Sequence, residues 1–270
     1  MNKKIVLISL LFTQITFAQN NNFGTGSAIP AGTGNTTAAG TFYNFIGGGG
    51  YNTNQANNAF IGAGVFNSNG ALRSGIGAGT SNMISSGPNN SLIGAGIGNQ
   101  ISESGPSSFI GAGKYNRIGS NGVPLGYSGD SSFIGAGTSN AISASVVNSG
   151  IVSGSLNQVY NPNSVYTNSN NFIGGGYSNV ISNVNFSTIA GGRKNWIDEN
   201  RSFIGGGESN IVSGSNSVIG GGRGNLVDSG SDHSAILGGF DNTIQSFRSY
   251  GTIGGGWSNV IGGGSTAQGQ

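Results

Sequence analysis

The chain of 270 residues contains no cysteine, one histidine and few charged residues. Without cysteine there is neither a disulfide nor a thiolate metal site, so backbone pairing and packing must hold the protein together. Charged residues make up 7% of the chain, and no lysine or arginine cluster marks a face for nucleic acid. The eight acidic residues are too scattered for the regular aspartates of calcium-binding repeat rolls. We therefore expect no metal, no cofactor and no nucleic-acid partner.

Catalytic motifs are also scarce. His233 lies between Asp232 and Ser234, which places the residue types of a hydrolase triad side by side. A triad needs side chains that converge in space, whereas adjacent residues of an extended chain point to opposite sides. No glycine-rich segment continues into the Gly-Lys-Ser/Thr of a phosphate loop. The sequence predicts that the protein is not an enzyme.

The longest apolar run near the start, residues 5–12, is too short to span a bilayer. It follows Lys3 and Lys4 and matches the apolar region of a signal peptide, with cleavage expected after Ala18. Removing these two lysines leaves eight basic and eight acidic residues, so the mature chain carries no net charge. We predict a signal peptide over 1–18, a secreted or cell-surface location, and no transmembrane segment in the mature chain.

What the chain has in excess is glycine, with 54 residues, and the glycines recur in a fixed pattern. One unit occurs thirteen times, and each copy contains an anchor isoleucine that we number position 0. Ten of the twelve intervals between anchors are 15 to 17 residues long, and the other two are 24 and 22. The anchors are Ile46, Ile61, Ile76, Ile93, Ile110, Ile134, Ile151, Ile173, Ile189, Ile204, Ile219, Ile236 and Ile253. Such a period predicts a solenoid of stacked coils.

Each unit has two invariant positions that follow the anchor. Position +3 is glycine and position +6 is asparagine in all thirteen units. Glycine at +3 predicts a corner with positive φ. The asparagines either bond to one another as an amide ladder from coil to coil or cap their own turns. In three C-terminal units the anchor, glycine and asparagine are Ile204, Gly207, Asn210, Ile219, Gly222, Asn225, Ile253, Gly256 and Asn259.

Each unit has the pattern of two short strands. The anchor and position +2 share one face of the first strand, and positions −1 and +1 share the other. Position +2 is always Gly, Ala or Ser, which fits a narrow interior, and position +8 is usually Ile or Val. The predicted fold class is an all-β parallel solenoid of about thirteen coils. We divide the chain into a signal peptide (1–18), a Gly/Ser/Thr-rich segment (19–43), the repeat domain (44–264) and a short polar tail (265–270).

Units such as residues 202–210, Ser-Phe-Ile-Gly-Gly-Gly-Glu-Ser-Asn, resemble the head repeats of trimeric autotransporter adhesins, the YadA-like left-handed parallel β-roll. The resemblance covers about residues 44–261. It implies a homotrimer whose packed rolls form a host- or matrix-binding head. Family repeats are typically shorter, and the chain shows neither a heptad stalk nor amphipathic anchor strands. A secreted head, a passenger of another export system and a truncated gene all remain open.

Outward-facing phenylalanines recur at position −1 in six units: Phe45, Phe60, Phe109, Phe133, Phe172 and Phe203. Stacked coils would turn them into an apolar stripe along the rod. Exposed stripes of this kind usually mark an interface between subunits. Connectors that fold over the stripe are the alternative.

Ligand contacts are expected at positions +4 and +5, which the repeat leaves variable. In register, these positions would form one edge rich in aromatic and basic side chains, types enriched at recognition surfaces. The candidate ligand-binding residues are Lys114, Tyr115, Tyr177, Arg193, Arg223 and Trp257. The predicted function is adhesion to a host, matrix or cell-surface ligand, a protein or a glycan. A monomeric solenoid that binds glycans or another extended surface, and a structural component of fibres or biofilms, are the alternatives.

Overall fold

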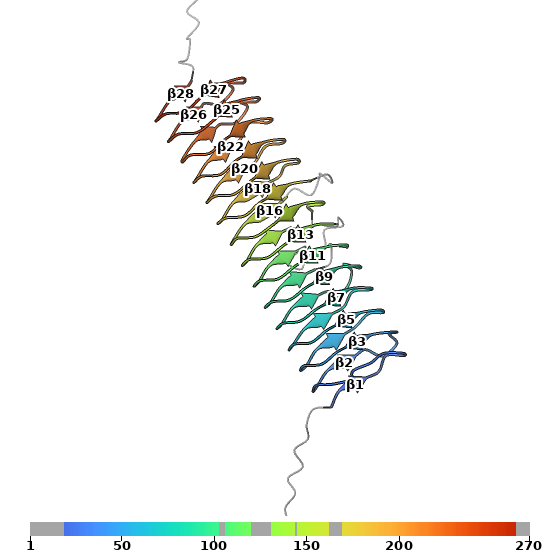
Figure 1. Ribbon diagram of the computed structural model, residues 1–270. Coiled ribbons are helices and arrows are strands. Elements are labelled where there is room, and N and C mark those ends of the chain that lie inside the picture. Colours follow the sequence, from blue (N-terminus) through green and yellow to red (C-terminus); the bar gives the residue numbers. More distant parts are fainter. Residues whose placement is uncertain (1–18, 103–105, 120–130, 144, 162–168, 263–270) are drawn as a thin grey trace, which may run out of the picture.

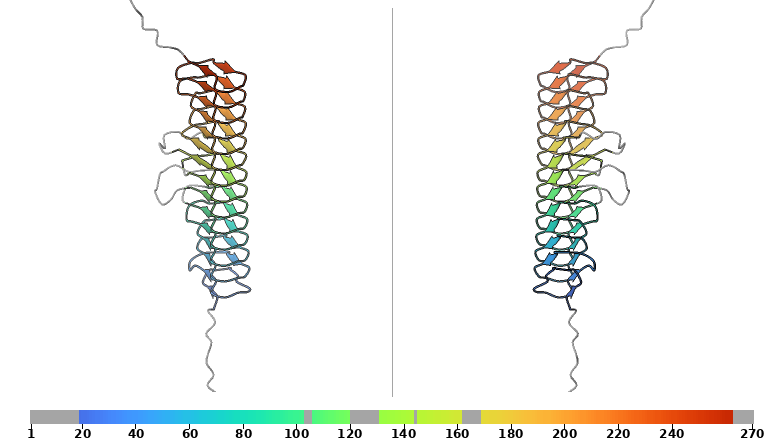
Figure 2. Two further views of the ribbon diagram at one scale, coloured as in Figure 1. Left: turned by 90° about the vertical axis from the view of Figure 1, so that its left-hand side faces the viewer. Right: turned by 90° about the vertical axis from the view of Figure 1, so that its right-hand side faces the viewer.

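The computed structural model describes residues 19–102, 106–119, 131–143, 145–161 and 169–262. These residues form an elongated rod of stacked coils (Figure 1). Two parallel sheets run along the rod, and each of the thirteen coils from residue 45 onwards contributes one short strand to each sheet (Figure 2). No described residue is helical. The predicted all-β parallel solenoid is therefore confirmed.

The first sheet has fifteen strands, and its members are β1 (Asn21–Asn22), β2 (Thr36–Thr37), β4 (Thr53–Asn54), β6 (Ser68–Asn69), β8 (Met83–Ile84), β10 (Gln100–Ile101), β12 (Arg117–Ile118), β14 (Ala141–Ile142), β16 (Gln158–Tyr160), β18 (Val180–Ser182), β20 (Trp196–Ile197), β22 (Ile211–Val212), β24 (Leu226–Val227), β26 (Thr243–Ile244) and β28 (Val260–Ile261). The second sheet has thirteen strands, and its members are β3 (Phe45–Ile46), β5 (Phe60–Ile61), β7 (Gly75–Ile76), β9 (Leu92–Ile93), β11 (Phe109–Ile110), β13 (Phe133–Ile134), β15 (Gly150–Ile151), β17 (Phe172–Ile173), β19 (Thr188–Ile189), β21 (Phe203–Ile204), β23 (Val218–Ile219), β25 (Ala235–Ile236) and β27 (Thr252–Ile253).

Strand register keeps equivalent positions of successive coils side by side. Ile204 pairs with Ile189 on one side and with Ile219 on the other. The same register holds across the connector of the longest interval, where Ile110 pairs with Ile134. Every repeat position therefore becomes a column along the rod.

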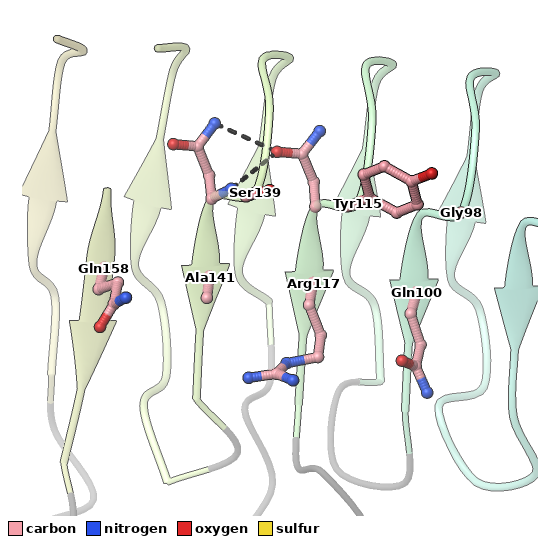
Figure 3. Close-up of a pocket in the computed structure, with 9 residues that line it drawn as sticks. Gly98, Gln100, Tyr115, Arg117, Ser139, Ala141 and Gln158 are labelled. Atoms are coloured by element: carbon pink, nitrogen blue, oxygen red, sulfur yellow. Dashed lines mark hydrogen bonds between the residues drawn. The ribbon is translucent and has the colours of Figure 1, made fainter. Parts of the chain in front are cut away.

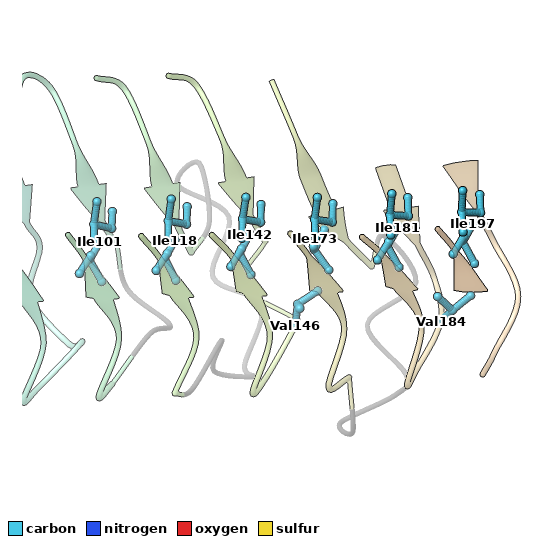
Figure 4. Close-up of a cluster of buried hydrophobic side chains, with 14 of the residues drawn as sticks. Ile101, Ile118, Ile142, Val146, Ile173, Ile181, Val184 and Ile197 are labelled. Carbon is cyan, nitrogen blue, oxygen red and sulfur yellow. The ribbon is translucent and has the colours of Figure 1, made fainter. Parts of the chain in front are cut away.

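The core consists of two facing columns, the anchors of one sheet and the +8 residues of the other, and both are aliphatic except for Asn54 and Asn69 at +8 (Figure 4). Ile134 and Ile142, from the two sheets, are completely buried. Burial of a side chain of this size stabilises the fold by about 1.5–3 kcal/mol. In two connectors, Val146 and Val184 join the cluster. The rod is thus held by a thin apolar core that is renewed at every coil.

Buried asparagines at +6 form a continuous ladder next to this core. The backbone N–H and the Nδ2 group of Asn210 both donate to Oδ1 of Asn195, at 3.0 and 3.2 Å. Nδ2 also lies 2.9 Å from the carbonyl of Gly206 in its own turn and 3.0 Å from that of Gly222 in the next coil. The two roles that the sequence left open, ladder and turn cap, are therefore combined in one side chain.

A second ladder runs along position −2, which the sequence did not single out. The backbone N–H of Ser217 donates to Oγ of Ser202, and that of Ser234 donates to Oγ of Ser217. Asn171 takes the same place in its coil, where Oδ1 accepts from the N–H of Ser187. These side chains are buried, so each supplies an acceptor to a backbone group that water cannot reach.

Each coil turns through three left-handed positions. Glycine at +3 has positive φ throughout, as predicted, and positive φ also occurs at +5 and −3. At +5, the N–H of Ser209 donates backward to the carbonyl of Arg193, whereas the N–H of the preceding Glu208 donates forward to Gly222. The left-handed residue thus lets one turn bond to both neighbouring coils. Position +5 is therefore not conformationally free.

Position +2 does not line the interior, contrary to our expectation. Gly48 and Gly175 are buried there, but Ala63 is exposed. A Cβ at Gly206 would meet no heavy atom within 4 Å. The strand ends at the anchor, so +2 already belongs to the corner rather than to the inward face. A narrow interior therefore does not explain why this position carries small residues.

The solenoid extends into residues 19–43, which the thirteen-unit pattern left outside. A further unit starts at Ile29, with Gly32 at +3 and Asn35 at +6. Oδ1 of Asn35 accepts from the N–H and Nδ2 of Asn52, so the ladder continues without a break. This unit was not recognised in the sequence because Pro30 occupies position +1, where no other unit has proline.

Substituting alanine for glycine at neighbouring positions tests this geometry. A Cβ at Gly207 would overlap the carbonyl oxygen of Gly222, and φ there is +87°. We expect Gly207→Ala to lower the free energy of unfolding by about 2 kcal/mol or more. Gly206→Ala should change it by less than about 0.5 kcal/mol. Urea unfolding followed by far-UV circular dichroism measures both, and equal losses would contradict the assigned corner.

Candidate functional site

Residues at position +4 form one unbroken edge of the rod. Parallel bridges link this position from coil to coil, from Thr33 at one end to Trp257 at the other. The backbone of the edge is fully engaged between coils, whereas its side chains point away from the core. The predicted in-register edge therefore exists.

The C-terminal part of the edge carries six large or charged side chains on consecutive coils. In order they are Tyr177, Arg193, Glu208, Arg223, Phe240 and Trp257. With about 4.8 Å between strands, five steps correspond to about 24 Å. Four of the six candidate ligand-binding residues belong to this run.

Several of these side chains already contact one another. Arg193 forms an ion pair with Glu208. The guanidinium carbon of Arg223 lies 5.6 Å from the centre of the Phe240 ring, a cation–π contact. Phe240 in turn meets Trp257 edge-on, with ring centres 6.3 Å apart. The six residues form one surface strip, within which side-chain contacts join two groups, Arg193 with Glu208 and Arg223 with Phe240 and Trp257.

The other two candidates lie apart from this strip. Lys114 belongs to the same column, but Thr138 and Ser155 separate it from Tyr177. Tyr115 is at the left-handed +5 position, and its ring lies against Gly98 of the preceding coil, where a Cβ would be 2.7 Å from the ring. The structure therefore brings together four of the six predicted residues and leaves Lys114 and Tyr115 in a separate region of the rod.

Charge is unevenly distributed along the rod. All described acidic residues lie between Asp198 and Asp241, whereas the described residues before Asp198 include basic side chains and no acidic ones. Glu103 and Asp130 fall outside the described residues. In the acidic part, the hydroxyl of Ser246 and the N–H of Ser229 donate to the Asp228 carboxylate and lower its pKa. Among the described residues, the acidic side chains are therefore confined to the C-terminal part of the rod.

The Asp-His-Ser run does not form a catalytic arrangement. His233 occupies the −3 column, and its ring stacks on Tyr250 with centres 5.1 Å apart. Ser234 is buried in the −2 ladder, and Oδ1 of Asp232 accepts from the N–H of Ser215. Each of the three side chains serves a different column of the solenoid.

Phenylalanines at −1 form the predicted stripe on the outer face of the thirteen-stranded sheet. Each of the six exposes between 37% and 41% of its surface, so the described connectors do not cover them. The rings of Phe45 and Phe60 stack with centres 5.9 Å apart. Further along, a Cβ at Gly150 would overlap the ring of Phe133 from the preceding coil. The −1 positions of successive coils stay in register along the sheet, but small residues such as Gly150 separate some of the phenylalanines from one another.

Comparisons with known proteins identify no family. No protein-family model matches the chain, and no curated protein sequence does. No helix of the described chain has the length and apolar character to cross a bilayer. Among the described residues, no three histidine or acidic side chains are grouped to hold a metal ion. Function must be inferred from the surfaces of the solenoid itself.

Proposed function

We propose that this chain is a secreted or cell-surface adhesive repeat protein, similar to an adhesin head, that binds a host, matrix or cell-surface ligand without catalysis. The observation that carries the proposal is the run of exposed aromatic and charged side chains from Tyr177 to Trp257, held in register by backbone bridges. The apolar segment after Lys3 and Lys4 supports export, although residues 1–18 lie outside the described part.

A rod with a variable edge suits adhesion for a physical reason. The coil-to-coil bonds already order the backbone on which the edge side chains stand, so ligand binding does not have to order that backbone. Aromatic and arginine side chains supply most of the energy at typical recognition surfaces. Several weak contacts at regular spacing along one line favour an extended ligand over a small molecule.

We propose further that the phenylalanine stripe is an interface between copies of this chain, most simply in a homotrimer. Six exposed phenylalanines in one column form an apolar surface that water penalises. Association would remove this surface from water and leave the +4 edge to bind ligands. A self-contained monomer that binds glycans is the competing hypothesis.

Replacing the edge residues by serine tests the adhesive role. Serine already occupies +4 at Ser155, so the triple variant Tyr177→Ser, Arg193→Ser, Trp257→Ser should fold. We expect its binding to immobilised extracellular-matrix proteins and glycans to fall at least about tenfold, because each replaced anchor contributes on the order of 1 kcal/mol or more.

The matched control replaces one arginine and two aromatic residues at the −3 corner, as Phe186→Ser, Arg201→Ser, Tyr250→Ser. Serine occurs at this corner in other coils, for example at Ser107. Binding of the control should equal that of the wild-type protein. If the edge variant binds as well as the control, the edge is not the adhesive surface.

Light scattering tests the proposed interface. We expect the mass of a trimer for the wild-type protein and the mass of a monomer for the double variant Phe109→Thr, Phe133→Thr. The double variant should fold, because threonine already occupies position −1 at Thr188. Leu226→Thr, on the outer face of the other sheet, should remain trimeric. A folded wild-type monomer would contradict the trimer, and a trimer unaffected by the double variant would locate the interface elsewhere.

A further inference from the structure

Neighbouring columns of the rod combine into continuous surfaces, because the register keeps their coils side by side. Figure 3 shows one example, a hollow of about 360 Å³ on the outer face of the fifteen-stranded sheet. Tyr115 lines it from the +5 column, and Arg117 and Ala141 line it from the +7 column. In the strip, the +4 side chains stand beside those at +5 in the same way. A ligand that lies along the strip therefore faces two columns.

The order of residues in the strip is complementary to its own reverse. Counted outward from the centre, its three pairs are Glu208 with Arg223, Arg193 with Phe240, and Tyr177 with Trp257. Each pair consists of groups that attract each other, namely opposite charges, a cation with a ring, and two rings. A second copy that runs in the opposite direction would therefore offer every residue of the strip a suitable partner.

The +5 column has the same symmetry. Lys194 and Asp241 lie three coils apart in it, at equal distances from the centre of the strip. Both side chains are exposed, and neither forms an ion pair among the described residues. Three strand steps correspond to about 14 Å, too far for the two to pair within one chain. The other +5 residues of these coils are serine or glycine, so an antiparallel copy would place Lys194 opposite Asp241 without a like charge nearby in that column.

We propose that the ligand of the strip is the strip of a second copy of this chain, running antiparallel, so that the protein joins surfaces that carry it. This inference rests on the adhesive role proposed above and names its partner. The two copies are related by a two-fold axis between the coils of Glu208 and Arg223, and each contact therefore occurs twice. Rods that project from two facing surfaces meet in this antiparallel orientation.

The charges select this arrangement over the alternatives. In a parallel two-fold pair every residue would face itself, so Arg193 would meet Arg193 and Glu208 would meet Glu208, which is repulsive. An antiparallel pair centred on the coil of Glu208 would also place Arg193 opposite Arg223. Centring it between Arg193 and Glu208 would leave Lys194 opposite Ser209. Only the centre between Glu208 and Arg223 gives an ion pair in both columns.

A single pair of strips makes a small contact. Its five strand steps correspond to about 24 Å along one edge, which is short for a stable interface. The ion pair of Arg193 and Glu208 within one copy is exposed to water, so little is lost when its groups also meet a second copy. Isolated rods therefore stay apart in dilute solution, whereas many rods fixed on one surface act together.

Reversal of the central charges tests the pairing. Beads coated with the full chain should aggregate, and beads coated with Glu208→Arg alone or with Arg223→Glu alone should aggregate at least about tenfold less, because like charges then face each other. When the two variant beads are mixed, they should aggregate with each other, since each reversed charge meets its complement. Arg201→Glu, at the exposed −3 corner, is the matched control and should aggregate like the wild-type protein.

Introduced cysteines test the orientation, because the chain has none of its own. Ser178 and Ser258 occupy +5 in the two outermost coils of the strip. On mild oxidation of mixed beads, a Ser178→Cys chain should form a disulfide with a Ser258→Cys chain at least about tenfold faster than either variant does with itself, because the bond needs closely placed backbones. Equal or faster linkage of either variant with itself would overturn the antiparallel arrangement.

Wild-type beads that stay dispersed, single variants that aggregate like the wild type, or mixed variants that fail to aggregate would each overturn the proposal. If dispersed wild-type beads still bind matrix proteins or glycans through the strip, the adhesive role stands and only the pairing of copies fails. The two failures are therefore distinguishable.

Discussion

The hydrogen-bonded ladder of buried asparagines sets the register on which every other feature of this rod depends. Strands of two residues have little stability of their own, and parallel pairing gives each of them few bonds. An asparagine at +6 ties its coil to both neighbours through side chain and backbone together. A slip by one residue would expose the anchor isoleucines and break the ladder at the same time.

Register divides the repeat positions into those that hold coils together and those that are free to vary. The core takes the anchor and position +8, the glycine corner takes +3, and the two ladders take +6 and −2. The left-handed positions +5 and −3 are restricted in backbone conformation but accept many different side chains. Positions −1, +4 and +7 face outward as three separate columns. Each column can therefore acquire its own surface chemistry without disturbing the coil: phenylalanines at −1, an aromatic and charged strip at +4, and a polar hollow at +7.

Much of the fold could be predicted because the repeat positions with the strictest structural requirements carry the same residue in every unit. Glycine alone fits the +3 corner, and asparagine at +6 meets donors and acceptors that no other side chain matches as well. The −2 ladder was not predicted because its position is not invariant: serine occupies it in nine of the thirteen units, but Asn171 and Gly251 occupy it in others. Left-handed conformations at −3 were hidden for the same reason, since residues as different as His233 and Arg73 adopt them.

The surfaces were predictable only in part. Side chains at +4 were placed correctly as an edge, but their contacts, such as Arg223 over Phe240, depend on which residues fall in adjacent coils. The hollow was missed entirely. It depends on Arg117 and Ala141, which are 24 residues apart in sequence and become neighbours only through the register.

The measurement that tests the ladder most directly compares Asn210→Ala with Asn259→Ala. Asn210 is completely buried within the ladder, whereas Asn259 is exposed in the last described coil. Loss of the Asn210 side chain leaves the N–H of Asn225 without its acceptor, and it removes one of the hydrogen bonds made by Nδ2 of Asn225 and by the carbonyl of Gly222. We expect a loss of about 3 kcal/mol in the free energy of unfolding and faster amide exchange in both adjacent coils, against a loss below about 1 kcal/mol for Asn259→Ala. Similar stability and exchange in the two variants would contradict the account.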